Sequence, residues 1–139
     1  MLSVIQFVHE MERFGLRVFK NAWFERFARK EKISAEALWD AVDRAEQGQI
    51  DADLGGGVIK QRIARPGGGK SKGYRSIVLY RKAGKAFFVF GFPKSEQDNI
   101  REDEEIQFKK MAKQVLALTD EQLQQLIANS QFEEVVKGA

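Results

Sequence analysis

Apolar residues recur at helical spacing in two consecutive segments near the start of the chain. Residues 22–30 place three aromatic side chains on one side of a helix. Ser34 is a good N-cap for a second helix over residues 35–47, and Gly48 is suited to end it. A short strand over residues 16–20 is expected before them. The pattern therefore predicts a short strand followed by a helical hairpin.

Strand-forming residues dominate the middle of the chain. The three expected strands cover residues 58–65, 74–81 and 85–92, and the last two are rich in β-branched and aromatic residues. The turn between Arg81 and Lys85 is short, so these two strands should pair antiparallel. That pairing would set Tyr80 near Ala86 and Arg75 near Gly91, close to Lys94.

Helical spacing returns after the strands. One helix is expected from about Asp103 to Leu118. Thr119 is suited to cap a last helix, because Gln122 follows it at the spacing of a capping box.

Composition excludes several classes of protein. A chain of 139 residues that is 43% hydrophobic and 31% charged is typical of one globular domain. There is no cysteine, and His9 is the single histidine, which argues against disulfides, a Ser-His-Asp triad and a multi-histidine metal site. No apolar run is long enough to span a membrane, and the first ten residues lack the basic start of a signal peptide. We expect a soluble, cytoplasmic domain.

Charge is distributed unevenly along the chain. Residues 54–95 contain no Asp or Glu but ten basic residues, which are Lys60, Arg62, Arg65, Lys70, Lys72, Arg75, Arg81, Lys82, Lys85 and Lys94. Solubility alone would be better served by mixed charges, so this stretch favours a polyanionic partner, and nucleic acid is the commonest one.

The glycine-rich segment 66–73 invites comparison with a nucleotide-binding P-loop. That motif needs a glycine at position 64, where this chain has Ala64, and a helix after the loop, where a strand is expected. The segment is therefore not predicted to hydrolyse nucleotides. Its backbone N–H groups can still approach an anion, with Lys70 and Lys72 beside it.

Three runs of residues resemble a known family. They are KQRIARPG at 60–67, GKSKGYR at 69–75 and GFPKSEQDNI at 91–100. In this order they resemble the RelE/ParE superfamily of bacterial toxins, and most nearly its RelE/HigB-like branch. The resemblance covers about residues 17–126.

The resemblance implies an α+β fold, in which two N-terminal helices pack on a small twisted antiparallel sheet and further helices follow at the C-terminal end. It implies a toxin domain over residues 17–128, an N-terminal extension over 1–16 and a C-terminal tail over 129–139. RelE-like toxins cleave mRNA at the ribosome and are neutralised by an antitoxin. The implied partners are thus mRNA, the ribosome and a cognate antitoxin, which we expect to be a helix-turn-helix DNA-binding protein.

The chemistry of RNA cleavage suits the residues present. RNA carries its own nucleophile, the 2′-hydroxyl, so no metal or cofactor is needed, but charge must be stabilised and protons moved. Without a usable histidine, Lys, Arg and Tyr are the candidates. The proposed catalytic residues are Arg75, Lys94, Lys70 and Lys72; Arg75 and Lys94 also match the family's catalytic basic positions. The proposed RNA-binding residues are Lys60, Arg62, Arg65, Tyr74 and Asn99.

The chain departs from the family at one position, and two other functions besides RNA cleavage remain possible. No tyrosine follows Tyr80, so the family's C-terminal catalytic tyrosine is missing or replaced. ParE-like relatives share the fold but inhibit gyrase and cut no RNA, since fold alone does not determine chemistry. A basic RNA-binding module without catalysis is the third possibility. The antitoxin is expected either to cover the basic stretch or to bind at a distance.

Overall fold

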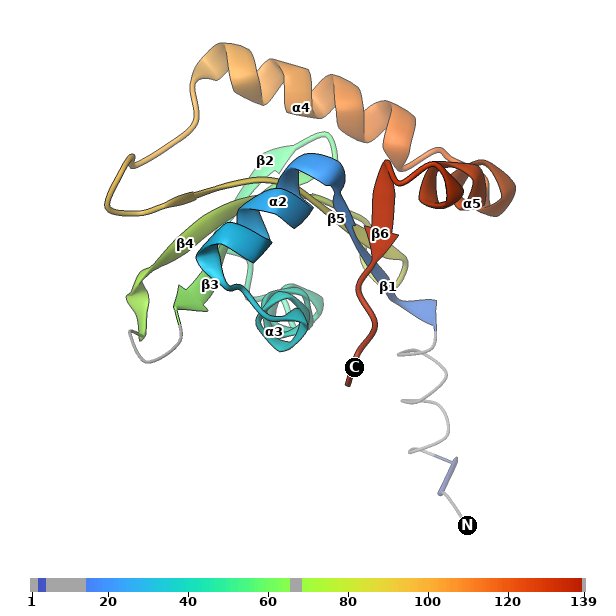
Figure 1. Cartoon of the computed structure of the whole chain (residues 1–139), viewed down its shortest axis with the longest axis horizontal. Coiled ribbons are helices and arrows are strands. Elements are labelled where there is room, and N and C mark those ends of the chain that lie inside the picture. The colour runs from blue at the N-terminus through green and yellow to red at the C-terminus, as the bar shows by residue number, and fades with distance from the viewer. Residues whose placement is uncertain (1–2, 5–14, 66–68, 139) are drawn as a thin grey trace.

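The computed structural model describes residues 3–4, 15–65 and 69–138 (Figure 1). Most of the expected extension over residues 1–16, with His9, and residues 66–68 of the glycine-rich segment lie outside these ranges. The elements are β1 (Arg17–Asn21), α2 (Ala22–Glu31), α3 (Ala35–Glu46), β2 (Ala52–Gly55), β3 (Val58–Arg65), β4 (Gly69–Tyr80), β5 (Lys85–Pro93), α4 (Glu102–Val115), α5 (Asp120–Ala128) and β6 (Phe132–Glu134).

The described residues form a six-stranded mixed sheet in the order β2-β3-β4-β5-β1-β6. The expectation of two N-terminal helices on a small antiparallel sheet is therefore wrong. The strand β1 precedes α2 and pairs parallel with β5, from Arg17 opposite Lys85 to Lys20 opposite Phe88. A parallel neighbour needs a long crossover connection, which the whole segment from α2 to β4 supplies. The short strands β2 and β6 widen the sheet at its two edges.

Helices cover both faces of the sheet (Figure 1). On one face, Phe24 of α2 and Leu38 of α3 are buried in an apolar core. On the other face, Ala112 of α4 and Leu123 of α5 lie in a second core with Phe87 of β5. A sheet covered on both sides explains why β5 is apolar at nearly every position.

The segment expected as a C-terminal tail contributes to this architecture. Phe132 pairs with Asn21 in the antiparallel ladder of β6 and β1. Val135 is buried, and its carbonyl oxygen accepts a hydrogen bond from Trp39 Nε1 at 2.9 Å. The folded domain thus extends at least to Val135.

Local sequence signals are confirmed at several points. The Ser34 side chain accepts a hydrogen bond from the N–H of Ala37 and caps α3. Thr119 and Gln122 form the expected capping box of α5. The N–H of Arg81 donates to the carbonyl oxygen of Lys85, which closes the hairpin between β4 and β5. Among the described helices, none has the length and apolarity to cross a membrane.

The register of β4 and β5 contains an irregularity. Tyr80 lies opposite Ala86 as expected, but Arg75 lies opposite Phe92, not Gly91. The shift arises because Ile77 pairs with Phe90 while Val78 pairs with Phe88, so Val89 is one extra residue on β5, as in a β-bulge. Such an insertion leaves no signal in an apolar strand.

Gly91 is needed at its position next to α2. A Cβ built there would lie 2.8 Å from a ring carbon of Phe27 and 3.1 Å from one of Phe24. Any larger residue would push α2 away from the sheet.

Candidate active site

Two arginines lie directly opposite each other on neighbouring strands. Arg62 of β3 pairs with Arg75 of β4. Side chains alternate along a strand, and Val58 and Ile77 belong to the core under α4 and α5, so both arginines lie on that face. Lys60, two residues before Arg62, shares the face as well. Three basic side chains therefore gather beside the α4 side of the sheet.

This arrangement places two positive charges side by side. Like charges directly opposite on paired strands repel each other. The Nε atoms of both Arg62 and Arg75 are buried and have no hydrogen-bond acceptor. A buried donor without an acceptor is costly, so an anion that offered oxygens to these two atoms would be bound favourably.

One carboxylate partly balances the pair. Asp51 Oδ2 accepts a hydrogen bond from the backbone N–H of Arg62 at 2.6 Å, and Asp51 Oδ1 lies 3.9 Å from Arg62 Nε. Within the described parts of the chain, Arg75 makes no ion pair. The sequence signal that could have singled out Asp51 is weak, because it lies in a polar turn among several acids.

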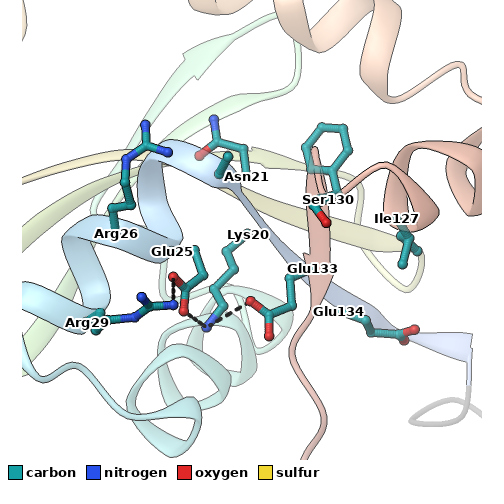
Figure 2. A pocket seen from close by; sticks show the side chains of 11 residues that line it. Lys20, Asn21, Glu25, Arg26, Arg29, Ile127, Ser130, Glu133 and Glu134 are labelled. Carbon is teal, nitrogen blue, oxygen red and sulfur yellow. Dashed lines mark hydrogen bonds and ion pairs between the residues drawn. The ribbon is translucent and has the colours of Figure 1, made fainter.

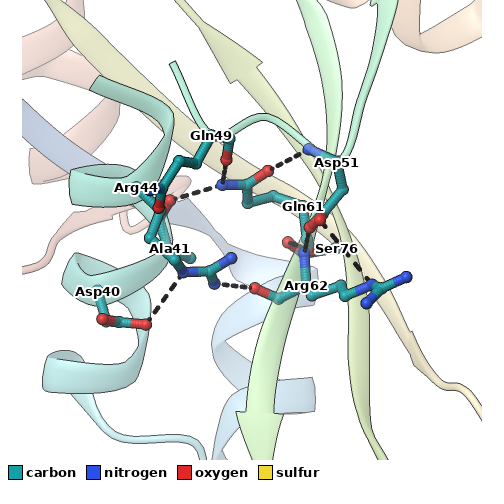
Figure 3. A network of polar contacts seen from close by, with 8 residues as sticks. All are labelled: Asp40, Ala41, Arg44, Gln49, Asp51, Gln61, Arg62 and Ser76. Atoms are coloured by element: carbon teal, nitrogen blue, oxygen red, sulfur yellow. Dashed lines mark hydrogen bonds and ion pairs between the residues drawn. The ribbon is translucent and has the colours of Figure 1, made fainter. Parts of the chain in front are cut away.

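A buried network holds β3 in place from the opposite face (Figure 3). Gln61, only 1% exposed, donates through Nε2 to the carbonyl oxygens of Ala41 at 2.9 Å and Gln49 at 3.0 Å. Its Oε1 accepts from the N–H of Asp51 at 3.0 Å, and Ser76 Oγ donates to its backbone carbonyl oxygen at 2.7 Å. The network ties the strand that carries Arg62 to α3 and to β4.

The connection from β5 to α4 closes one side of the site. Lys60 Nζ donates a hydrogen bond to Asn99 Oδ1 at 3.2 Å. The backbone N–H of Lys94 donates to the carbonyl oxygen of Gly73 at 3.2 Å, and the Lys94 side chain is exposed. The backbone of Lys94 is thus bonded to β4 at Gly73, two residues before Arg75 on the same strand. Asn99, expected to contact RNA, has Lys60 as its partner here.

Tyr74 and Arg65 lie on the other face. Tyr74 is 3% exposed, its ring meets Phe27 edge-on at 5.7 Å, and its hydroxyl donates to the carbonyl oxygen of Glu31 at 3.3 Å. Arg65 covers the same ring, with Nε donating to the Tyr74 hydroxyl at 3.4 Å, and this bond raises the pKa of Arg65. Placed in this way, the Tyr74 ring offers no open face to a base.

The ten basic residues of the middle segment divide between the two ends of the sheet. Arg81 and Lys82 are exposed in the turn between β4 and β5, and Lys85 pairs with Asp120 at 3.3 Å. They lie away from the Arg62–Arg75 pair. The side chains of Lys70 and Lys72 lie outside the described part of the structure, although their backbone belongs to β4.

The residues gathered at this site are of the kind that bind phosphate. No group of three or more His, Asp or Glu side chains that could hold a metal ion occurs among the residues that the structure describes. Guanidinium groups bind phosphate oxygens through paired N–H donors. The fold and the site define a small, basic α/β protein with two opposed arginines on one face of its sheet.

Comparison with known protein families identifies the family of this chain. The model of the RelE toxin of the RelE/RelB toxin–antitoxin system matches residues 16–135. The match spans most of the 139 residues, so the chain belongs to the RelE toxin family and is a toxin of a toxin–antitoxin pair. No curated protein and no solved structure gives a significant match.

Proposed function

We propose that this toxin is a metal-independent endoribonuclease of the RelE/HigB-like type, which acts on mRNA at the ribosome in the cytoplasm. The observation that carries the proposal is the pair Arg62 and Arg75, two opposed guanidinium groups whose buried Nε atoms lack acceptors. A scissile phosphate between them would supply those acceptors. Its negative charge, which grows in the transition state, would also relieve their repulsion.

The reaction proposed is an internal transfer. A base removes the proton of the 2′-hydroxyl, the 2′-oxygen attacks the adjacent phosphorus, and the bond to the 5′-oxygen breaks as that oxygen takes a proton from an acid. The products are a 2′,3′-cyclic phosphate and a free 5′-hydroxyl. Lys60 and Lys94 are the candidates for the two proton transfers, and Lys70 and Lys72 are proposed to contact the same phosphate or its neighbours.

The residues expected to bind RNA take other roles in this proposal. Lys60 and Arg62 act at the scissile phosphate, as described above. Asn99 orients Lys60 through their hydrogen bond of 3.2 Å. Tyr74 supports the strand from the core, with Arg65 over its ring at 5.4 Å. No described tyrosine lies beside the arginine pair, so lysines carry the proton transfers here.

The test is cleavage by purified toxin on translating ribosomes, with mRNA 5′ ends mapped by primer extension. We expect cleavage with 5′-hydroxyl products, which Arg75→Ala slows about a hundredfold. Toxicity without any RNA cleavage would reject the nuclease. Inhibition of supercoiling by gyrase in the same preparation would then favour the ParE-like alternative, and RNA binding alone the non-catalytic one.

A further inference from the structure

An uncharged groove lies between the start of α2 and the C-terminal half of α4. Its volume is about 430 Å³, and none of the described residues that line it is charged, in a chain that is 31% charged. The lining side chains include Trp23, Met111, Val115, Leu118, Leu126 and Phe132. The groove contains none of the basic residues of the candidate active site.

Trp23 forms one wall of the groove and is fixed there. It is 38% exposed, and its ring lies 5.3 Å from that of Phe27 and 4.7 Å from that of Phe90. A rigid, partly exposed aromatic side chain binds a partner with little loss of conformational entropy, and tryptophan is enriched among the residues that dominate binding energy.

A charged cavity, which Figure 2 shows, shares lining residues with the groove. Asn21, Ala22 and Phe132 line both of them. In the cavity, Lys20 Nζ lies 3.7 Å from Glu25 and 3.8 Å from Glu133. Arg26, on the exposed side of α2, makes no ion pair with any residue that the structure describes. The continuous surface thus joins an apolar half to a half with a free positive charge.

We propose that this surface is the docking site of the antitoxin. The occupant is a segment of the antitoxin that places large apolar side chains against Trp23 and a carboxylate beside Arg26. The proposal rests on membership of a toxin–antitoxin family, which supplies a protein partner, and not on the nuclease mechanism. RNA fits this surface poorly. The groove has no positive charge for its phosphates, and the adjoining cavity carries Glu25, Glu133 and Glu134 beside its basic residues.

Docking here would leave the Arg62–Arg75 pair uncovered. The antitoxin then neutralises the toxin by its bulk beside α4, which keeps the site from a large substrate, rather than by filling the site. In the complex, a small anion should therefore still reach the two arginines. This distinguishes docking beside α4 from an antitoxin that fills the active site.

The test uses the toxin as the whole chain together with its purified cognate antitoxin. We expect Trp23→Ser and Gln114→Lys each to weaken binding about tenfold or more in calorimetry. Gln114 is an exposed groove residue of α4, so its variant keeps the core intact. Gln107→Lys is the matched control, since Gln107 lies seven residues earlier on the same helix, is exposed and does not line the groove.

Growth assays test antitoxin docking without any assumption about how the toxin acts on RNA. Both groove variants should remain toxic and escape rescue by the antitoxin, whereas Gln107→Lys should be rescued. Wild-type affinity in both groove variants would overturn the proposal. So would a change of the toxin's own oligomeric state in Gln114→Lys with antitoxin binding intact, because the groove would then be a contact between two copies.

Discussion

The side-chain amide of Asn21 donates a hydrogen bond through Nδ2 to the carbonyl oxygen of Val89 at 3.1 Å. Val89 is the extra residue of β5, and the same amide accepts a hydrogen bond from the N–H of Phe24 at 2.8 Å, which caps α2. One side chain therefore joins the start of a helix to an irregularity of the sheet. That irregularity brings Phe92, rather than Gly91, opposite Arg75.

Asn21→Asp should separate the two roles of this amide. Aspartate caps a helix as well as asparagine does, but it cannot donate to Val89. We expect the free energy of unfolding to fall by about 1–2 kcal/mol, as for a lost hydrogen bond at a buried acceptor. Urea unfolding measures it. Ser34→Asp is the control, because Ser34 caps α3 without such a donated bond, and it should change stability by less than about 0.5 kcal/mol.

Arg75→Ala should abolish growth arrest and slow RNA cleavage about a hundredfold, which corresponds to about 3 kcal/mol of lost transition-state stabilisation. Arg75→Lys should restore only part of the rate, because lysine lacks the planar pair of donors. The melting temperature should not fall, since the change removes a buried unpaired donor and a repulsive charge.

Arg81→Ala is the matched control for that experiment, because Arg81 is exposed at the other end of β4. It should keep full toxicity. A folded Arg75→Ala protein with wild-type cleavage would remove Arg75 from the mechanism, and Arg62→Ala would become the decisive variant.

Asp51→Asn should strengthen RNA binding and weaken the fold. Asparagine keeps an acceptor for the N–H of Arg62 but removes the only carboxylate found beside the two arginines in the described structure. We expect RNA affinity to rise about threefold and the free energy of unfolding to fall by about 1 kcal/mol. Filter binding and urea titration measure the two effects. Asp53→Asn, whose carboxylate bonds the N–H of Gly55, should change neither.

Asn99→Ala should lower the rate of cleavage about tenfold and leave RNA affinity unchanged, because Asn99 orients Lys60. Single-turnover kinetics over a range of toxin concentrations separates rate from affinity. Gln97→Ala, which removes only a bond to the Asn99 carbonyl oxygen, is the control. If affinity falls and the rate at saturation does not, Asn99 binds RNA directly, as the sequence first suggested.

The raised pKa of the Tyr80 hydroxyl should make the protein less stable in alkaline solution. Burial, and then the hydrogen bond from its hydroxyl to Glu46, raise the pKa of Tyr80 above the ordinary value of 10.0. The folded state thus keeps a proton that the unfolded state releases, so this contribution is complete below pH 10 and is lost as the pH rises above it. Melting temperatures between about pH 9 and 11 should fall more steeply for the wild type than for Tyr80→Phe. Equal slopes would contradict the assignment.

The sequence predicted those elements whose signals are local. The cap at Ser34, the capping box at Thr119 and the hairpin at Arg81–Lys85 all depend on neighbouring residues and are present. The strands β2 and β6 cover only four and three residues, too few to show a period of two, and both were missed. The parallel pairing of β1 with β5 is a long-range choice that no local pattern records.

The candidate site was predicted in part for a similar reason. The segment without acids indicated the basic residues, and the structure brings Lys60, Arg62 and Arg75 together on one face. The sequence could not show that a bulge at Val89 shifts the register, or that Tyr74 turns into the core. Both depend on packing against α2, a helix that precedes these strands by many residues.

The position of β1 in the sheet has a consequence for the life of the toxin in the cell. This strand lies between β5 and β6, and its Arg17 bonds Glu134, 117 residues further along the chain. Contacts between such distant residues form late in folding. A nascent chain on its own ribosome therefore lacks a partner for β1 on one side until synthesis has passed Glu134. The six-stranded sheet of the toxin is therefore complete only once β6 has been synthesised.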